Sequence, residues 1–368
     1  MSQTAIYSLS ADPITFGHIN IIERAAKSFE KVIVAIGNNP SKKYLLTQEE
    51  RLQVASDSLF YIDNVQVVVF EGLLVDFAFL NNVDVIIRGL RNIEDFQYEQ
   101  DLNSVNNSIL DTIDTFYLLS EPDKHHISSS TAKALVKENV FSHEYLSLSA
   151  KQILELKINN QIFVGVTGLV GAGKSYISRE LVKYSESLDN IPVHNIDIDL
   201  LAHKIYKEKN PLFIKVRKQI QDEFGTLDRT TLGTIVFNDA EKLNTLNSIF
   251  KSPLELLIRQ AVSGLTGIIL LNGATIISDY FLPICNNNIL FIDTCKEIRK
   301  MNCISGRKMD AEKFYEIDSV MISKEQQYQT INRLIIKHNF GETLEVSNDR
   351  NLSISEVYES LLSTFSES

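Results

Sequence analysis

Two loops in this chain carry residues that could bind phosphate groups. The first is Asp12-Pro13-Ile14-Thr15-Phe16-Gly17-His18 and the second is Gly168-Leu169-Val170-Gly171-Ala172-Gly173-Lys174-Ser175, and each follows a short apolar segment. A helix that begins in such a loop points its free backbone N–H groups and the positive end of its dipole at an anion. The sequence therefore predicts two phosphate sites, and with them two nucleotide sites.

The second loop fits the pattern G-x-x-x-x-G-K-[ST] between a predicted strand and a predicted helix. In such a loop the N–H groups surround the phosphates, the lysine contacts the β- and γ-phosphate oxygens, and the hydroxyl binds Mg²⁺. Asp197 and Asp199 end the next predicted strand and could serve as a base and a metal partner. The competing interpretations are a glycine-rich turn with an incidental Lys-Ser pair, and a helix cap at the aspartates.

The first loop is less specific by itself. Gly17 allows the backbone to approach a phosphate and His18 could donate to a phosphoryl oxygen, but a capping threonine followed by an unrelated histidine has the same letters. Further donors follow other predicted strands, namely Lys42, Arg88, Arg91 and the Ser128–Ser130 run. Because the carboxyl ends of parallel strands share one crevice, we expect these donors to converge.

Strands and helices are predicted to alternate twice along the chain. In the first half we expect strands at 5–7, 31–36, 65–70, 83–88 and 115–119, and helices at 17–29, after the capping box Thr47–Glu50, and at 75–80, 92–108 and 129–136. In the second half we expect strands at 162–166, 193–196, 268–271 and 288–293, and helices at 174–184 and 241–263 with an interruption near Ser252-Pro253; a helical pattern then continues up to a polar tail.

This alternation predicts an α/β fold. Because a chain of 368 residues is longer than one hydrophobic core usually supports, we expect two domains. The expected domains are residues 1–158, with a Rossmann-like, parallel, doubly wound sheet, and residues 159–368, with the G-x-x-x-x-G-K-[ST] loop of a P-loop domain. An ordered segment, with a helix over 149–157, is expected to join them.

The composition excludes several classes of function. A net charge of -11 argues against general nucleic-acid binding, which needs a basic surface. Cys285, Cys295 and Cys303 lack the short paired spacing of a zinc site and are typical of reduced thiols. The N-terminus has no signal-peptide layout, and the apolar run near 265–271 is too short to cross a bilayer. We therefore expect a cytoplasmic protein with no membrane or nucleic-acid partner.

Five stretches of the first half together resemble bacterial phosphopantetheine adenylyltransferase: Asp12–His18, Pro40–Lys43, Ile87–Arg91, Asp95–Glu99 and Ile127–Ser130. The resemblance covers about residues 4–158. It implies adenylyl transfer from ATP to 4′-phosphopantetheine, which yields dephospho-CoA and pyrophosphate. In that family the acceptor phosphate attacks the α-phosphorus in line without a protein nucleophile, so catalysis consists of positioning and charge stabilisation.

This resemblance implies residue roles by position. His18 would stabilise the transition state, Lys42 and Arg88 would hold the acceptor phosphate, and Ser10 and Leu74 would line the acceptor pocket. The implied ATP-binding residues are Ser10, Ala11, His18, Gly89, Leu90, Arg91, Glu99, Lys124, Ser128, Ser129 and Ser130. Leu9 replaces a family glycine and Lys124 replaces an aromatic residue, so ATP binding and base stacking are expected to differ. The family often forms oligomers, so a homo-oligomer through this domain is allowed.

The stretches 165–175, 197–202 and 229–237 resemble dephospho-CoA kinase, over about residues 161–345 and more weakly after 250. The resemblance implies phosphorylation of the ribose 3′-hydroxyl of dephospho-CoA by ATP and Mg²⁺. Asp197 would accept the hydroxyl proton, Arg307 would be a lid arginine beside the transferred phosphate, and Asp279 would lie near the substrate. ATP would contact Gly171, Ala172, Gly173, Lys174, Ser175 and Tyr176, with Lys174 catalytic and with Ser175 and Asp199 at the metal.

The second resemblance has larger departures, and these leave alternatives open. Ser252-Pro253 stands for a His-Pro pair, 275–279 differs from the family segment, and 300–325 has few of the expected arginines. One alternative is an adenylyltransferase whose P-loop domain only binds nucleotide or regulates. Another is a nucleotidyltransferase with a different phosphorylated acceptor. The bifunctional enzyme is favoured, because the product of the first reaction is the substrate of the second.

Overall fold

The fold is described from a computed structural model, over residues 3–39, 42–91, 93, 95–97, 99–100, 113–124, 126–236, 239–273, 276–348 and 352–366. The side chains of residues 229, 230, 240 and 307 also lie outside this description, as does most of the helix expected over 92–108. The chain divides into two compact units. Unit 1 comprises residues 1–137, 142–158 and 335–340, and unit 2 comprises 138–141, 159–334 and 341–368.

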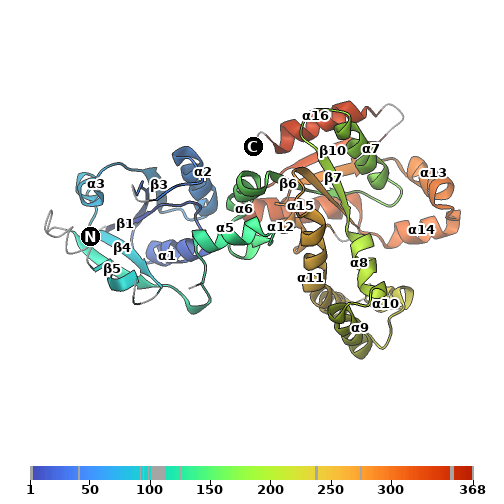
Figure 1. The fold of residues 1–368 in the computed structure, drawn as a ribbon, viewed down its shortest axis with the longest axis horizontal. Coiled ribbons are helices and arrows are strands. Elements are labelled where there is room, and N and C mark those ends of the chain that lie inside the picture. Colours follow the sequence, from blue (N-terminus) through green and yellow to red (C-terminus); the bar gives the residue numbers. More distant parts are fainter. Residues whose placement is uncertain are drawn as a thin grey trace. The chain divides into compact units, whose positions relative to one another are not determined.

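Unit 1 is built on a parallel five-stranded sheet in the order β3-β2-β1-β4-β5 (Figure 1). The strands are β1 (Thr4–Leu9), β2 (Lys31–Ile36), β3 (Val65–Val69), β4 (Val85–Leu90) and β5 (Asp114–Leu119). The described helices are α1 (Phe16–Ala26), α2 (Gln48–Leu59), α3 (Leu74–Leu80), α5 (Ser129–Lys137) and α6 (Leu148–Leu154), with the short turns η1 (Pro122–Lys124), η2 (Ser142–Glu144) and η3 (Glu155–Asn159).

The buried residues of the unit 1 sheet lie on both faces of the central strands β1, β2 and β4, which explains why these strands are apolar, whereas β3 and β5 are partly exposed. Within β2, alternate residues face opposite sides, so that Val32 and Val34 join one buried cluster and Ile33 joins another. The expected capping box is confirmed at the start of α2. Thr47 Oγ1 accepts from the Glu50 N–H at 3.2 Å, and Glu50 Oε2 accepts from the Thr47 N–H at 2.8 Å.

Unit 2 repeats the architecture with a parallel sheet in the order β10-β9-β6-β8-β7. Its strands are β6 (Gln161–Thr167), β7 (Val193–Asp197), β8 (Gly267–Asn272), β9 (Ile289–Asp293) and β10 (Thr343–Ser347). Its helices are α7 (Lys174–Glu186), α8 (Ile198–Lys207), α9 (Pro211–Phe224), α10 (Arg229–Val236), α11 (Ala240–Val262), α12 (Phe281–Ile284), α13 (Lys296–Arg307), α14 (Ala311–Val320), α15 (Lys324–His338) and α16 (Ile354–Phe365).

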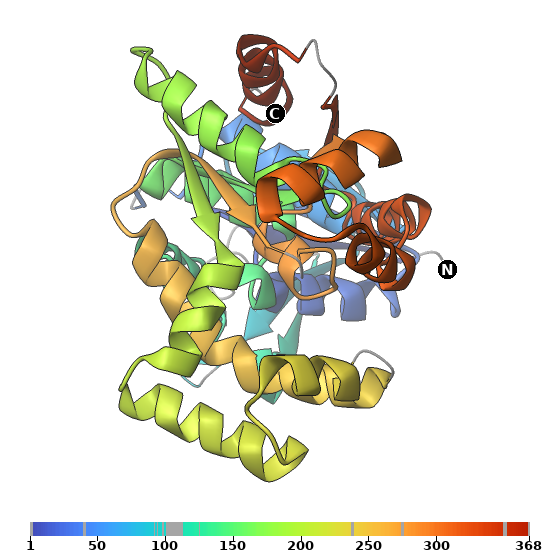
Figure 2. The same ribbon diagram turned by 90° about the vertical axis from the view of Figure 1, so that its right-hand side faces the viewer.

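The helices of unit 2 fall into groups. Figures 1 and 2 show α9 and α10 away from the sheet, reached through α8 and α11, while α13 follows the carboxyl end of β9 and packs on α14. The predicted α/β class is confirmed in both units. None of the helices in the described part of the chain is long and apolar enough to cross a membrane.

Three local predictions for unit 2 were wrong. Helix α11 runs through Pro253 without the expected interruption. A further strand, β10, adds an edge to the sheet in a region where a mainly helical pattern was expected. The segment expected as a polar tail forms α16, whose Val357, Tyr358 and Leu361 are buried. Its serines and glutamates masked an apolar stripe at helical spacing.

Candidate functional site

A cavity of about 420 Å³ opens in unit 1 at the carboxyl ends of its strands. Parallel sheets place ligands at this edge, because loops from several strands meet there. The cavity is lined by Tyr7, Ser10, Asp12, Gly17, His18, Ile21, Lys42, Lys43, Tyr44, Gly89, Arg91, Ser120, Ile127, Ser128, Ser129, Ser130 and Lys133. The donors that the sequence placed at separate strand ends therefore share one cavity.

The start of helix α1 fixes His18 in this cavity. Thr15 caps the helix, and its backbone N–H donates to His18 Nδ1 at 3.1 Å. Because a backbone N–H can only donate, Nδ1 carries no proton, and the ring hydrogen of the neutral imidazole lies on Nε2. His18 thus presents a neutral N–H donor.

The surroundings of His18 keep it neutral. Burial and, to a smaller extent, the positive charges of Arg91 and Lys42 together lower the pKa of His18 from 6.5 to about 4. These two cations therefore lie close to the imidazole, and all three side chains line the cavity. The arrangement offers two positive charges and one neutral donor to a phosphate-bearing ligand.

A direct consequence is that His18 stays neutral through the physiological range. In a ¹³C-¹H NMR titration, the ring signal of His18 is expected to stay constant from about pH 8 to pH 5 and to shift only near pH 4. A His18→Gln variant assigns the signal by its loss. A midpoint above pH 6 would contradict the described environment.

Asp12 organises the loops around the cavity. Its carboxylate accepts from the N–H groups of Leu45, at 3.1 and 3.2 Å, and Leu46, at 2.9 Å, and from Lys133 Nζ at 2.7 Å. Although burial opposes it, the hydrogen bonds from Lys133, Leu46 and Leu45 lower the pKa of Asp12. The carboxylate therefore ties the first loop to the 45–46 segment and to α5.

Asp12→Asn is expected to destabilise unit 1 by about 1–3 kcal/mol at pH 7, because Lys133 loses its charged partner. Since the folded pKa of Asp12 is lowered, its stabilisation is present above the unfolded value near about 4 and is lost as the pH falls through the folded value. The difference in thermal midpoint between wild type and Asp12→Asn should therefore narrow in acid. A constant difference down to the lowest pH at which both fold would refute this account.

Several predicted residues lie outside the cavity lining. These are Ala11, Leu74, Arg88, Leu90, Glu99 and Lys124. Arg88 instead pairs with Glu99, at 3.1 Å between Nε and Oε2, and donates to Ser8 Oγ at 3.2 Å. Leu74 packs at the edge of an apolar cluster and Lys124 pairs with Asp123 at 2.8 Å.

The cavity also contains residues that the motif analysis did not assign. Tyr7, Tyr44, Ser120 and Lys133 are the polar ones among them. Helical spacing could have indicated Lys133, which lies four residues after Ser129 on α5 and so on the same face. Tyr7 carried no such signal, because it lies within an apolar strand. Burial raises its pKa to about 12, so it remains an O–H donor.

The second loop follows β6 and leads into α7 in unit 2. Gly168 and Gly171 have φ values of 140° and 77°, which residues with a side chain rarely adopt. A Cβ atom would lie 2.2 Å from the Ile292 carbonyl oxygen at Gly168 and 2.3 Å from the Arg299 carbonyl oxygen at Gly171. Glycine is therefore required at both positions by conformation and by space.

Side-chain donors bind the carbonyl oxygens of this loop. Lys174 Nζ donates to the oxygens of Gly168 at 2.6 Å and Leu169 at 3.2 Å. The remaining partners are Arg299 on Val170, Asn302 on Gly171, and Thr294 and Asn348 on Ala172, at 2.8–3.1 Å. The carbonyl groups of residues 168–172 are thus occupied, and α7 begins shortly after them at Lys174.

The other predicted residues of unit 2 take varied places. Asp197 ends β7 and caps α8, with its Oδ1 accepting from the Leu200 N–H at 2.9 Å, and Asp199 lies in the first turn of α8. Ser175 and Tyr176 lie in the first turn of α7. Asp279 pairs with Arg333, and the side chain of Arg307 lies outside the described part of the chain.

Comparison with known proteins identifies the family to which the first half of the chain belongs. A family model described as cytidylyltransferase-like matches residues 10–135. The phosphopantetheine adenylyltransferase of Vesicomyosocius okutanii is 37% identical over 158 residues, which is 100% of that protein and 43% of this chain. The chain belongs to the phosphopantetheine adenylyltransferase family. The relatives of Symbiobacterium thermophilum (45% identity, 78% of its length, 34% of this chain) and Haemophilus ducreyi (36%, 100% and 44%) bear the same name.

The second half of the chain matches a further family. A family model described as dephospho-CoA kinase matches residues 162–341. A crystal structure from Thermus thermophilus aligns with 55% of this chain and 97% of its own, at 19% identity and a TM-score of 0.43. Both resemblances inferred from the sequence are confirmed, and the chain has a coenzyme A synthase-like arrangement.

Proposed function

We propose that this chain catalyses the last two steps of coenzyme A synthesis. Unit 1 transfers the adenylyl group of ATP to 4′-phosphopantetheine, and unit 2 phosphorylates the resulting dephospho-CoA on its 3′-hydroxyl. One observation carries the proposal: the two matched families, on one chain, catalyse reactions that share dephospho-CoA as product and substrate. The setting is the cytoplasm, in keeping with three cysteines that form no disulfide.

In the first reaction an oxygen of the acceptor phosphate forms a bond to the α-phosphorus of ATP, and the bond to pyrophosphate breaks. The cavity supports this by charge and position, without a protein nucleophile. Neutral His18 donates from Nε2 to an oxygen of the α-phosphate, whose charge grows in the transition state, while Lys42 holds the acceptor phosphate. Arg91 and the Ser128–Ser130 run bind the phosphates of ATP at the start of α5.

Two of the proposed acceptor and ATP contacts, Arg88 and Glu99, pair with each other. The pKa of Glu99 is raised by burial, although the charge of Arg88 acts in the opposite direction. Both lie at the carboxyl end of the sheet beside the cavity-lining Gly89 and Arg91. We therefore keep Arg88 as an acceptor ligand that exchanges Glu99 for the incoming phosphate.

In the second reaction the 3′-hydroxyl oxygen attacks the γ-phosphorus of ATP, its proton passes to Asp197, and ADP leaves. Lys174 and the N–H groups at the start of α7 bind the β- and γ-phosphates. Ser175 and Asp199 would supply one hydroxyl and one carboxylate to Mg²⁺, which prefers oxygen ligands, and would leave the other coordination positions to phosphates and water. When bound, Mg²⁺ neutralises charge that develops on the phosphates.

The test is a coupled assay on the full chain with 4′-phosphopantetheine, ATP and Mg²⁺, followed by mass detection of the products. The proposal requires dephospho-CoA to appear first and coenzyme A to follow. Accumulation of dephospho-CoA alone would mean that unit 2 binds nucleotide without kinase activity. The departures from the kinase family at 252, 275–279 and 300–325 are the reason for considering this alternative. No product with phosphopantetheine, but adenylylation of another phosphorylated acceptor, would change the substrate of unit 1.

A further inference from the structure

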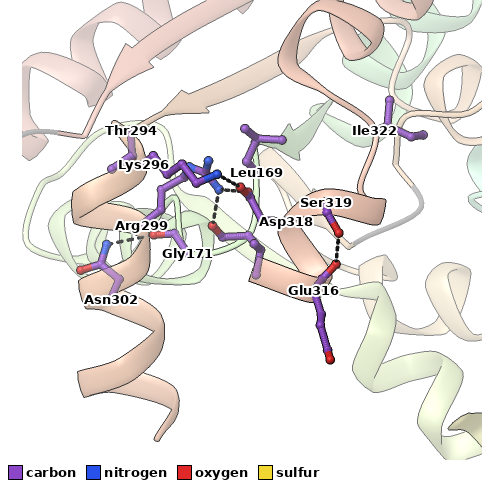
Figure 3. A network of polar contacts seen from close by, with 12 residues as sticks. Leu169, Gly171, Thr294, Lys296, Arg299, Asn302, Glu316, Asp318, Ser319 and Ile322 are labelled. Atoms are coloured by element: carbon purple, nitrogen blue, oxygen red, sulfur yellow. Dashed lines mark hydrogen bonds and ion pairs between the residues drawn. The ribbon is translucent and has the colours of Figure 1, made fainter. Parts of the chain in front are cut away.

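The phosphate loop of unit 2 is supported from behind by α13 and α14. Figure 3 shows Arg299 of α13 lying between Asp318 of α14 and the loop, with Asn302 beside Gly171. Arg299 Nη1 donates to the Val170 carbonyl oxygen at 3.1 Å and to Asp318 Oδ1 at 2.6 Å. Its side chain is buried, with 5% of the residue exposed, so these contacts are shielded from solvent.

We propose that Arg299 and Asp318 are positioning residues of this phosphate site, which hold the loop in its anion-binding form and couple that form to α14. The inference rests on the proposed function of unit 2, because it assigns a role towards the same nucleotide. It concerns residues that no part of the G-x-x-x-x-G-K-[ST] pattern contains.

Peptide geometry explains how a contact on a carbonyl can act on a phosphate. In a trans peptide the C=O of one residue and the N–H of the next point in opposite directions. A donor that holds the Val170 oxygen on the outside therefore turns the Gly171 N–H to the other side. Thr294 and Asn348, which donate to the Ala172 oxygen, do the same for the Gly173 N–H. Inward-facing N–H groups of this kind form an anion site.

Asp318 makes this support depend on α14. Its second oxygen accepts from Lys296 at 2.9 Å, so the carboxylate joins two cations of α13. Although burial opposes it, the hydrogen bonds from Arg299 and Lys296 lower the pKa of Asp318, which keeps it charged. Phe314 of α14 packs with Val170 of the loop and Cys303 of α13. A shift of α14 would therefore reach the loop by an ion pair and by packing.

The close fit between α13 and the loop explains why Arg299 can act at short range. A Cβ atom at Gly171 would lie 2.3 Å from the Arg299 carbonyl oxygen and 2.9 Å from Cys303 Sγ. The backbone of α13 therefore touches the loop at the same residue whose N–H is oriented. Asn302, one turn further along α13, donates to the Gly171 oxygen at 2.9 Å.

The experiment follows the loop itself, on the full chain labelled with ¹⁵N-glycine. Titration with ATP is monitored at the Gly171 amide signal, which separates this site from the ATP site of unit 1. Arg299→Met is expected to raise the half-saturating ATP concentration at least tenfold, and Asp318→Asn about threefold to tenfold. Lys300→Met is the matched control, because Lys300 lies next to Arg299 and its Nζ donates to the hydroxyl oxygen of Tyr315 on α14 at 3.0 Å. This variant should change the half-saturating ATP concentration less than twofold.

Kinetics with added dephospho-CoA supply a second readout. A positioning role raises the KM for ATP and changes kcat less, whereas a merely structural role lowers the fraction of active enzyme and leaves KM unchanged. Should Arg299→Met fail to fold, Arg299→Lys and Asp318→Asn carry the test. If these variants bind ATP with wild-type affinity, as monitored at the Gly171 signal, the inference about Arg299 and Asp318 is wrong and the proposed function of unit 2 is unaffected. A wild-type chain whose Gly171 signal ignores ATP overturns the proposed function of unit 2 as well.

Discussion

Replacing His18 by alanine is expected to lower the rate of adenylyl transfer about a hundredfold or more. The ring is neutral, is oriented by the Thr15 N–H and presents its Nε2 hydrogen inside a cavity that also contains Lys42 and Arg91. Loss of one preoriented donor to a developing oxyanion costs about a hundredfold to a thousandfold in rate. The measurement is pyrophosphate release from ATP and 4′-phosphopantetheine.

The same variant should leave the second reaction almost unchanged. His18 lies in unit 1, so phosphorylation of added dephospho-CoA is expected within about twofold of the wild-type rate. His18→Gln retains an N–H donor and should recover part of the lost adenylyl transfer. An equal loss of both activities in His18→Ala would show that the two units do not function independently.

Replacing Lys174 by alanine should have the opposite effect, with loss of the second reaction and retention of the first. Coenzyme A formation is expected to fall about a hundredfold or more, while dephospho-CoA is formed at the normal rate and accumulates. The lysine brings the only side-chain charge of the G-x-x-x-x-G-K-[ST] pattern to the β- and γ-phosphates, and no other residue of that pattern can replace it. Product masses over time measure both effects in one reaction.

A lysine on the same helix provides the control. Lys183 lies nine residues further along α7, is exposed, and pairs with Glu180 at 2.8 Å. Lys183→Ala removes the same charge from the helix and should leave both rates unchanged, because an exposed pair contributes little. Normal coenzyme A formation in Lys174→Ala would mean that the loop does not bind the transferred phosphate.

Local sequence signals were sufficient for the fold class and for most elements. Apolar segments predicted all five strands of the unit 1 sheet and four strands of the unit 2 sheet, and the capping box at Thr47 predicted the start of α2. The failures have a physical cause. Strand β10 is a short edge strand that pairs only with β9. Its formation therefore depends on a partner strand that is about 50 residues away along the chain. The apolar stripe of α16 is interrupted by polar letters and is recognisable only where it packs.

The sequence by itself determined which chemical groups are present and in which order. The glycines of the second loop, Lys174 and the Thr15–His18 run are local patterns, because the bonds that shape them join residues a few positions apart. Tertiary structure alone decided the charge state of His18, which depends on burial and on cations from two other strand ends. It also decided the support of the second loop by Arg299 and Asp318, since Arg299 lies 129 residues from Val170 along the chain and their contact depends on how the strands are ordered.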